Sequence, residues 1–555
     1  MSSTLAAFEA DSRRLLHGVV RHWAARTPDS LALINHDRGH EVTWRRLDEA
    51  STAIARQLVR MGFRKGDFLA ASLPFLTEHV YLEYACFQIG VVHAPLDLRL
   101  PPAEVIRCLN LIRPRGFAFP GQTRAADFRE LGRAVAKHCP FVGHLIQFSP
   151  PEDLIEGAES FSELAAGREP VGLDEAHRAM TSAVDENDGA LVIFTTGSTG
   201  APKPALLSHR NIACQNDCLG AAFGFDRFTR LLVNLPPSHV GGQTEALMTT
   251  LYGGGTAVLL EAFDAARSLE AVARHRANLV GQIPAMFQLE WRLAGYSGYD
   301  LSSLRTAIYG GQQVSRQFLE RLREMAPRIG TGLGLTETAG FCTYTPDGAT
   351  VDGILASIGH PMPVYPMSIR QPMREDGAAG EELPDGDIGH VCFRGPQTFL
   401  GYVNDPAATA RAISREGWLY TGDMGFRDAA GLHFAGRAKW VIKPAGNQVF
   451  PAEVENHLCA LADRVAQAGV VGVPHAVLSE GIVAFVEKKP GARLEAAELK
   501  RHARGMASYM RPLHYVVLEP GAMPLNRVAK IDYVRLSEMA RAEVERLRAL
   551  RRWDR

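Results

Sequence analysis

Two spacings of apolar residues alternate along the first part of the chain. Residues 47–61 carry apolar side chains at the three- and four-residue intervals of a helix, which ends at Gly62. The apolar run 68–73 is typical of a buried strand, and the succession repeats as a helical segment over 78–90 and a strand-like segment over 91–96. This alternation predicts an α/β fold in which helices cover a largely parallel sheet.

The length of the chain and its later patterning indicate more than one domain. A chain of 555 residues exceeds what a single hydrophobic core usually holds, so two or more domains are expected. Residues 371–387 are rich in Gly, Glu, Asp and Pro, which predicts a surface loop or hairpin within a β-rich region. Residues 537–555 combine helical propensity with many Arg and Glu residues, which predicts a solvated terminal helix.

Composition narrows the class of protein. Apolar residues make up 46% of the chain and charged residues 22%, and the net charge of −1 leaves no basic surplus for nucleic acid. The N-terminus lacks the charged and apolar parts of a secretory signal, and no apolar run approaches the ~20 residues of a membrane span. Eight cysteines without a CxxC pair indicate reduced thiols and no zinc site. We therefore expect a cytoplasmic protein with no membrane span and no nucleic-acid partner.

The most informative segment is a loop of small and hydroxyl residues that ends in a lysine. It lies between the strand-like runs 191–194 and 204–207 and reads Thr195, Thr196, Gly197, Ser198, Thr199, Gly200, Ala201, Pro202, Lys203. Free N–H and O–H donors with little side-chain bulk can wrap an anion, and the lysine adds a positive charge. The loop is not a Walker A motif, because Pro202 stands in the place of a glycine and no Ser or Thr follows Lys203.

This loop resembles the phosphate-binding loop of the ANL adenylate-forming superfamily. Further motifs in family order extend the resemblance from about Leu15 to Lys530. Members activate a carboxylate with ATP as an acyl-adenylate and usually pass the acyl group to a thiol. The resemblance implies a large N-terminal domain of layered β-sheets and helices over 1–436, a hinge over 437–439 and a small mobile α/β domain over 440–555. It also implies ATP, Mg²⁺ and coenzyme A, with the loop and Lys203 holding the β- and γ-phosphates.

A second matching motif spans residues 332–338. By resemblance, the Thr336 hydroxyl holds the α-phosphate and Glu337 binds Mg²⁺, an ion that takes one or two protein carboxylates beside phosphate oxygens. The alternative is a simple capping Thr–Glu pair at the start of a helix. Leu333 stands where relatives commonly place Tyr or Trp against the adenine, so apolar contact would replace ring stacking.

The segment 309–312 resembles the family's Gly-Gly-Ala segment, whose backbone lines the adenine and acyl pockets. Gly310 and Gly311 match this pattern, whereas Gln312 replaces a small residue. The resemblance therefore assigns all three residues to nucleotide binding. It also implies that Gln312 either narrows the pocket or donates a hydrogen bond inside it.

The C-terminal part carries residues expected to bind the ribose and the thiol. Asp423, in a Thr-Gly-Asp signature, would accept hydrogen bonds from both ribose hydroxyls, because a carboxylate offers two acceptor oxygens. By resemblance, Arg437 approaches the ribose and phosphates, and Lys439 is the hinge residue. Gly446 would lie along the pantetheine channel, where a thin thiol arm passes backbone. The sequence assigns no role to Trp440.

The segment 524–531 resembles the motif of the family's catalytic lysine. Lys530 would bridge the substrate carboxylate and the α-phosphate and so bring two anions together. The family typically has glycine before this lysine, where this chain has Ala529. A solvated surface lysine is the alternative.

The segment 235–242 aligns with a family segment beside the acyl pocket. Amino-acid-activating members place an aspartate there, and this stretch has no acidic residue until Glu245, which indicates a carboxylic acid without an α-amine. By resemblance, the acyl group is also faced by Tyr309, Gly334, Leu335, Thr338 and Ala339, which suggests a mid-sized aryl, alicyclic or acyl acid. His239 matches a catalytic gate residue of CoA-ligating relatives, with a packed structural histidine as the alternative. The leading hypothesis is an ATP-dependent acid–CoA ligase. The alternatives are loading of a carrier-protein thiol and competence in one half-reaction alone.

Overall fold

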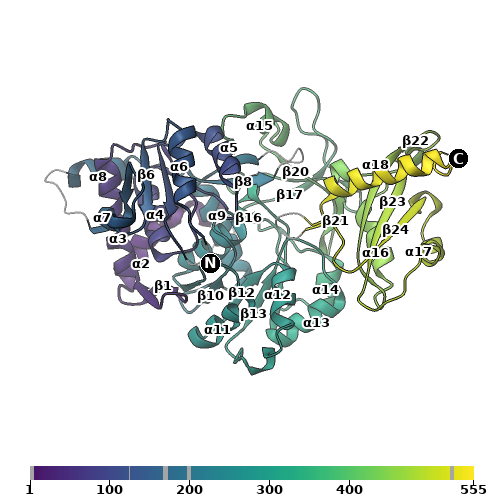
Figure 1. The fold of residues 1–555 in the computed structure, drawn as a ribbon, viewed down its shortest axis with the longest axis horizontal. Helices are drawn as coiled ribbons and strands as arrows, with labels where there is room; N and C mark the ends of the chain where they lie inside the picture. Colours follow the sequence, from purple (N-terminus) through teal and green to yellow (C-terminus); the bar gives the residue numbers. More distant parts are fainter. Residues whose placement is uncertain (1–4, 124–125, 167–172, 197–201, 526–529, 555) are drawn as a thin grey trace. The chain divides into compact units, whose positions relative to one another are not determined.

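The chain folds into two compact units. The computed structural model describes residues 5–123, 126–166, 173–196, 202–525 and 530–554. The first unit comprises residues 1–367 and 393–419, and the second comprises 368–392 and 420–555 (Figure 1). The expected hinge at 437–439 therefore lies inside the second unit, and the place where the chain pivots stays a prediction.

An eight-stranded sheet forms one half of the first unit. Its strands from β8 to β7 are parallel, whereas β9 and β19 pair antiparallel at one edge. In spatial order the strands are β19 (Gly401–Tyr402), β9 (Pro202–Ser208), β8 (Gly189–Thr196), β4 (Val92–Pro95), β3 (Phe68–Ala71), β5 (Gly116–Pro120), β6 (His144–Phe148) and β7 (Ala158–Ser160). Apolar residues of β3, β4 and β5 pack with those of the neighbouring helices in one buried cluster.

A seven-stranded sheet forms the other half of the first unit. All its pairings are parallel except that of β1 with β2. Its order is β14 (Arg328–Gly330), β13 (Thr306–Tyr309), β12 (Leu279–Gln282), β10 (Arg230–Val233), β11 (Thr256–Leu259), β1 (Leu31–Asn35) and β2 (His40–Thr43). These two sheets confirm the largely parallel α/β fold that the alternating pattern predicts.

Capping residues mark the ends of helices in the first unit. Helix α3 (Trp44–Arg60) starts where the Thr43 side chain accepts a bond from the Arg46 N–H, and it is followed by Gly62 at φ +82°. The other helices are α1 (Leu5–Glu9), α2 (Leu16–Arg26), α4 (Thr77–Gln88), α5 (Pro102–Ile112), α6 (Arg129–His138), α7 (Phe161–Ala166), α8 (Leu173–Ser182), α9 (His209–Phe223), α10 (Thr249–Gly253), α11 (Ala265–His275), α12 (Pro284–Trp291), α13 (Arg316–Met325), α14 (Val351–Ala356) and α15 (Pro406–Ala412). The predicted order of helix, strand, helix and strand over 47–96 is confirmed.

Short elements between these helices and strands carry much of the expected chemistry. They are a π-helix, η3 (Gly241–Met248), a two-stranded ribbon of β15 (Gly334–Leu335) and β16 (Gly340–Phe341), and the single-turn helix η5 (Thr336–Thr338). π-helical turns are rare and occur often at functional sites.

The second unit contains two smaller sheets. One has the order β17 (Met367–Arg370), β18 (Gly389–Phe393), β20 (Leu419–Asp428) and β21 (Gly431–Arg437), and the polar segment 371–387 connects its first two strands as expected. The other consists of β22 (Val465–His475), β23 (Ser479–Lys488) and β24 (His514–Leu518). Helices α16 (Pro451–Cys459) and α17 (Ala496–His502) contribute Val454 and Leu499 to a buried cluster on this second sheet.

The terminal helix is packed rather than simply solvated. Helix α18 (Tyr533–Ala549) buries Leu536, Ala540, Val544 and Leu547 in a cluster with β22 and β23, and Figure 1 shows it in yellow alongside these strands. Most of its Arg and Glu residues are exposed, but Glu543 bonds to His514 of β24 and Arg548 donates to the Pro474 carbonyl of β22. The expectation of a merely solvated helix is wrong, because one buried residue per turn is enough to dock a charged helix.

The structure has neither a disulfide nor a membrane-spanning helix among the residues that it describes. All eight cysteines are free thiols, and seven of them are buried. Among the helices that the structure describes, none combines the length and apolarity that crossing a bilayer requires.

Acid should weaken the first unit through a buried histidine pair. His79 Nδ1 lies 3.1 Å from the Pro74 carbonyl and its Nε2 lies 2.9 Å from His93 Nε2. Burial lowers the pKa of His79 from 6.5 to about 4. Between these two pH values, the His79 imidazole is protonated in the unfolded chain but stays neutral in the folded chain. Stability is therefore lost as the pH falls from 6.5 towards 4, by at most about 3 kcal/mol for this group.

Urea unfolding of His79→Gln between pH 7 and 4.5 tests this expectation. Glutamine does not titrate, so the variant should lose less stability on acidification than the wild-type chain. The exposed His138→Gln is the matched control and should leave the slope unchanged. Parallel slopes for His79→Gln and the wild type would contradict the prediction.

Candidate active site

The two strands that flank the glycine- and hydroxyl-rich loop form a hairpin. Thr195 of β8 lies opposite Lys203 of β9, and Thr196 lies opposite Pro202. The predicted strands on both sides of the loop are thus confirmed. The remaining expected phosphate-binding residues lie outside the described part of the chain: Gly197, Ser198, Thr199 and Gly200.

Tyr402 joins Lys203 to Glu337. The Lys203 ammonium lies 5.2 Å from the centre of the Tyr402 ring, and the Tyr402 hydroxyl donates a 2.7 Å hydrogen bond to Glu337 Oε1. Burial, together with the negative charge of Glu337, raises the pKa of Tyr402, so its hydroxyl stays protonated and acts as a donor. The structure therefore brings two predicted residues together through a third that no sequence motif marked.

Tyr402 reaches this position through pairing of distant strands. β19 pairs antiparallel with β9, and Tyr402 lies opposite Ala205 in the register. The backbone N–H of Phe399, just before β19, also donates to the Glu337 carbonyl at 3.0 Å. No local spacing in the sequence signals this partner, because the contact depends on a long-range strand pairing.

Thr336 and Glu337 lie in a turn held by Thr338. The buried Thr338 hydroxyl donates to the Gly340 carbonyl at 2.7 Å, and the Ala339 N–H donates to the Thr336 carbonyl at 2.9 Å. The side chains of Thr336 and Glu337 remain half-buried. The half-buried Glu337 carboxylate can supply an oxygen ligand to Mg²⁺ beside phosphate oxygens, and the nearby Lys203 ammonium can offset the charge of those phosphates.

Two glycines that precede this turn in the chain are tightly packed. A Cβ on Gly332 would lie 1.9 Å from the Thr343 carbonyl oxygen, and one on Gly310 would lie 3.1 Å from the Phe341 ring. Leu333 is held by its N–H, which donates to Thr343 Oγ1 at 2.9 Å. In the same region, Gly311 has a φ of +98° and the Gln312 side chain is exposed, outside the packed interior.

His239 immediately precedes the π-helix. Its Nδ1 accepts a 3.0 Å hydrogen bond from the Gly241 N–H, so the neutral ring carries its proton on Nε2. The π-helix is tied to the Glu337 turn, because Thr244 Oγ1 donates to the Ala339 carbonyl at 2.6 Å. His239 is half-buried and belongs to the same part of the first unit as Thr336 and Glu337.

Asp423 and Arg437 pair in the second unit. They lie opposite one another on β20 and β21, and Arg437 Nε is 2.8 Å from Asp423 Oδ1. The Asp423 side chain is 1% exposed, whereas that of Arg437 is 46% exposed. A buried carboxylate thus pairs with an accessible arginine, and the ribose-binding and phosphate-binding roles expected of the two residues stay predictions.

Lys439 and Trp440 begin a row of contacts that reaches the body of the second unit. The Lys439 ammonium lies 4.9 Å from the Trp440 ring, which stacks on the Tyr533 ring at 5.6 Å. The Tyr533 hydroxyl donates to Glu455 Oε1 at 2.8 Å, and burial raises the pKa of that carboxyl to about 7. Trp440 thus packs the segment after the expected hinge against Tyr533 of α18, which in turn bonds to Glu455 of α16.

Replacing Trp440 with alanine should open this segment to protease. Loss of the stacking and cation–π contacts removes about 1–2 kcal/mol of local stability, which corresponds to about 5- to 30-fold faster tryptic cleavage at Arg437 or Lys439. Trp440→Phe retains a ring and should stay close to the wild-type rate. Equal cleavage rates for the alanine variant and the wild type would contradict the role of this row.

Gly446 and Lys530 also belong to the second unit. Gly446 has a φ of +83° and no atom within 4 Å of the position of a Cβ, so its backbone is open to a passing ligand. Lys530 is half-buried and follows directly after residues 526–529, which lie outside the described residues. The ends of this segment are joined by a bridge between Leu525 and Ile531.

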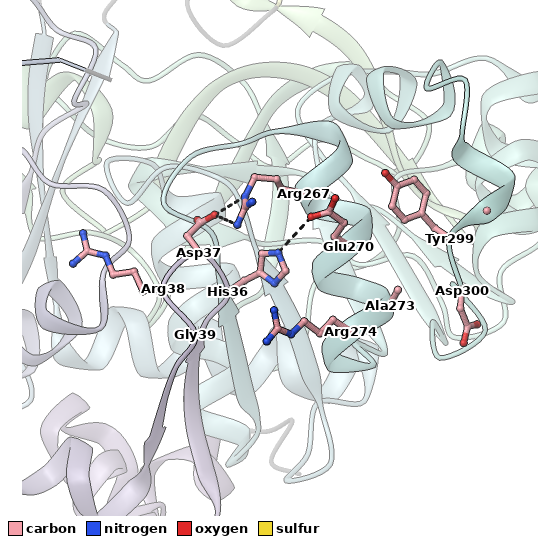
Figure 2. Close-up of a pocket in the computed structure, with 11 residues that line it drawn as sticks. His36, Asp37, Arg38, Gly39, Arg267, Glu270, Ala273, Arg274, Tyr299 and Asp300 are labelled. Carbon is pink, nitrogen blue, oxygen red and sulfur yellow. Dashed lines mark hydrogen bonds and ion pairs between the residues drawn. The ribbon is translucent and has the colours of Figure 1, made fainter. Parts of the chain in front are cut away.

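An open pocket of about 760 Å³ lies elsewhere in the first unit (Figure 2). Its Asp37 accepts a 2.6 Å hydrogen bond from Arg267, and His36 lies 4.0 Å from Glu270. Three arginines and three carboxylates line it, so their charges cancel and no surplus positive charge favours a nucleotide. None of the sequence-predicted residues that the structure describes lines this pocket.

Family models match both parts of the chain. The model described as AMP-binding enzyme matches residues 20–403, and the model described as AMP-binding enzyme C-terminal domain matches residues 453–530. Together they include every described residue expected at the site except those between 404 and 452.

Individual relatives match over most of their length. A feruloyl-CoA synthase from an Amycolatopsis species is 32% identical, covering 85% of this chain and 89% of that protein. The fatty acid–[acyl-carrier-protein] ligase ScoC of Streptomyces coeruleorubidus is 30% identical, with 89% and 90% covered. The crystal structure of ATP-bound MatB from Rhodopseudomonas palustris has a TM-score of 0.81 at 25% identity, with 94% and 98% covered.

Proposed function

The chain belongs to the AMP-binding enzyme family as an AMP-forming acid–CoA ligase, and we propose that its substrate is an aryl or alicyclic carboxylic acid without an α-amine. It uses ATP, Mg²⁺ and CoA: ATP and the acid give acyl-AMP and pyrophosphate, and the acyl group then passes to the CoA thiol with release of AMP. The aryl class is supported by the similarity to a feruloyl-CoA synthase. We place the protein in the cytoplasm.

The contact between Tyr402 and Glu337 carries the proposed adenylation site. The Tyr402 hydroxyl orients the Glu337 carboxylate, and the Lys203 ammonium lies against the ring of the same tyrosine. One carboxylate and one ammonium are therefore positioned around a single side chain. Glu337 would hold Mg²⁺, which when bound supplies positive charge to the phosphate oxygens. Lys203, with the loop that precedes it, would hold the β- and γ-phosphates that leave as pyrophosphate.

Other residues would position the nucleotide and the acid. Thr336 would donate to the α-phosphate and Asp423 would accept bonds from the ribose hydroxyls. The Lys530 ammonium would offset the negative charges of the substrate carboxylate and the α-phosphate as these two groups come together. Arg437 would bind ribose and phosphate oxygens, and the His239 Nε2–H would face the acyl carbonyl.

The remaining residues would contact the adenine, border the path of the thiol and allow the movement between the two half-reactions. Gly310, Gly311, Gln312 and Leu333 would line the adenine. Lys439 would act as the hinge, and Gly446 would border the path of the pantetheine arm, in keeping with its positive φ and open surroundings.

A carrier-protein thiol is the second candidate acceptor. The similarity to an acyl-carrier-protein ligase favours it, since the first half-reaction is the same for both acceptors. Pyrophosphate release over a panel of carboxylic acids tests adenylation. Adding CoA or a carrier protein and identifying the product by mass tests the acceptor. Pyrophosphate release without an acyl-CoA product would sink the CoA assignment.

A further inference from the structure

A carboxyl group lies in the core of the first unit, bonded to the π-helix. Glu83 occupies the middle of helix α4 and is 1% exposed, and Gln243 of the π-helix η3 is fully buried. The Gln243 Nε2–H donates a hydrogen bond to Glu83 Oε1. An apolar residue could fill the position of Glu83 without the cost of burying a carboxyl, so packing alone does not account for a glutamate at this place.

Glu83 is a neutral acid in the folded protein. Burial raises the pKa of its carboxyl well above the usual range, and the hydrogen bond from Gln243 offsets only part of that shift. A neutral carboxyl has an O–H donor as well as an acceptor oxygen. Among the described residues no donor reaches Gln243 Oε1, which is buried. The Glu83 Oε2–H can therefore donate to Gln243 Oε1 while Glu83 Oε1 accepts from Gln243 Nε2, which gives an acid–amide pair.

The π-helix is tied to its surroundings by side-chain hydrogen bonds. The Thr244 carbonyl accepts from Asn216 Nδ2 of α9 at 2.8 Å and from Thr249 Oγ1 at 3.0 Å. The Thr244 hydroxyl donates to the Ala339 carbonyl at 2.6 Å. The bond from Gln243 adds a tie to α4. Because π-helical turns are rare and occur often at functional sites, a set of bonds that holds this one in place bears on the site beside it.

His239 is bonded to the first turn of this π-helix. Its carbonyl accepts from the Gln243 N–H at 2.9 Å and from the Gly242 N–H at 3.1 Å. Its ring Nδ1 accepts from the Gly241 N–H at 3.0 Å. The side chain of Gln243 is thus held by Glu83, while its backbone is bonded to His239. The direction of the His239 ring therefore depends on where Gln243 is held.

We propose that Glu83 is a positioning residue: through its acid–amide pair with Gln243 it holds the π-helical turn that directs the His239 ring towards the acyl carbonyl. Glu83 is buried in the core and acts through His239. A displacement of about 1 Å at a reacting group can cost about 10²-fold in rate, so a residue that positions one can have a large effect. This inference rests on the proposed function, because that function places the acyl carbonyl at His239.

Acyl-CoA formation from synthetic acyl-AMP and CoA measures a step in which His239 is expected to act. Glu83→Leu leaves the Gln243 amide buried without a partner and should lower kcat by about 10-fold or more. Glu83→Gln keeps an acceptor oxygen and has an N–H donor for Gln243 Oε1, so its kcat should stay within about 3-fold of the wild type. A loss in Glu83→Gln as large as that in Glu83→Leu would overturn the inference.

Glu49→Leu and Glu49→Gln are the matched controls for these two variants. Glu49 is exposed on α3, and both substitutions should keep the wild-type kcat.

A variant of His239 separates positioning from general support of the core. His239→Ala should lower kcat, and in that background Glu83→Leu should cause less than about 2-fold further loss, because its effect passes through the missing ring. A purely structural role of Glu83 would lower the rate by the same factor with or without the His239 ring. That result, or a wild-type rate in His239→Ala, would overturn the inference.

Hydrogen exchange of the π-helix gives a readout that needs no substrate. The amides of residues 241–248 should exchange about 10-fold faster in Glu83→Leu than in the wild type, and at close to the wild-type rate in Glu83→Gln. Gln243→Met removes the same pair from the other side and should reproduce both effects if Glu83→Leu does not fold. Wild-type exchange in Gln243→Met would overturn the inference.

The outcomes separate this inference from the proposed function. If no carboxylic acid supports pyrophosphate release by the wild type, the proposed function fails, and the role of Glu83 fails with it. If the wild type forms acyl-CoA and Glu83→Leu does so at the same rate, the proposed function stands and the inference alone is overturned.

Discussion

Replacing Lys530 with alanine should lower the rate of acyl-AMP formation by about 10³-fold, because a positioned donor to developing charge is worth this much in a polar reaction. Thioester formation from supplied acyl-AMP should stay within about 3-fold of the wild type, because the carboxylate and the α-phosphate are already joined in that substrate and no cation is needed to bring two anions together. The measurements are pyrophosphate release with acid and ATP, and acyl-CoA formation with synthetic acyl-AMP and CoA.

Two further variants distinguish a role of Lys530 in adenylation from a general effect on folding. Lys500→Ala removes an exposed lysine from α17 of the same unit and should leave both half-reactions unchanged. Lys530→Arg keeps the charge and should recover part of the adenylation rate. Equal losses in the two half-reactions of Lys530→Ala would contradict a role in adenylation.

Replacing Glu337 with glutamine should lower adenylation by about 10²-fold and raise the Mg²⁺ concentration needed for half-maximal rate. The substitution keeps the size of the side chain and an acceptor for the Tyr402 hydroxyl, but removes the negative charge. Pyrophosphate release measured across a Mg²⁺ titration separates weaker metal binding from a slower reaction.

Tyr402→Phe is the matched control for Glu337. It removes the 2.7 Å hydrogen bond to Glu337 Oε1 and leaves the carboxylate in place. We expect a loss of less than about 10-fold, in line with one neutral donor to a charged acceptor. If the phenylalanine variant lost as much as Glu337→Gln, or if the Mg²⁺ requirement did not change in Glu337→Gln, the metal-binding role of Glu337 would be wrong.

Local patterns in the sequence predicted much of the fold. Helical spacing before Gly62 and the apolar runs after it correspond to α3, β3, α4 and β4, because periodic apolar residues report directly which face of an element is buried. The strands around the phosphate-binding loop were predictable for the same reason. The sequence predicted a terminal helix but not the packing of α18, since its four buried residues are separated by Arg and Glu and only a partner surface shows that they pack.

Short motifs marked the candidate site residues, whose roles stay predictions. Asp423 and Arg437 lie opposite each other on paired strands, and Thr336 and Glu337 share one turn, as a short motif can imply. Tyr402 carries no such mark. It acquires its partner Glu337 through the pairing of distant strands, and no local pattern in the sequence signals that contact. Trp440 was conspicuous in the sequence, yet its stacking partner is Tyr533, the first residue of α18, which no local pattern indicates.

What the sequence by itself determined is the class of reaction and the order of its parts. A loop that ends in Lys203, the Thr-Glu turn, the Thr-Gly-Asp signature and Lys530 are each short enough for chemistry to be read from neighbouring residues. The tertiary structure alone decided which side chains meet, as Tyr402 does with Glu337 and Trp440 with Tyr533. These contacts join separate strands and helices, so their geometry exists only after the sheets have formed and packed.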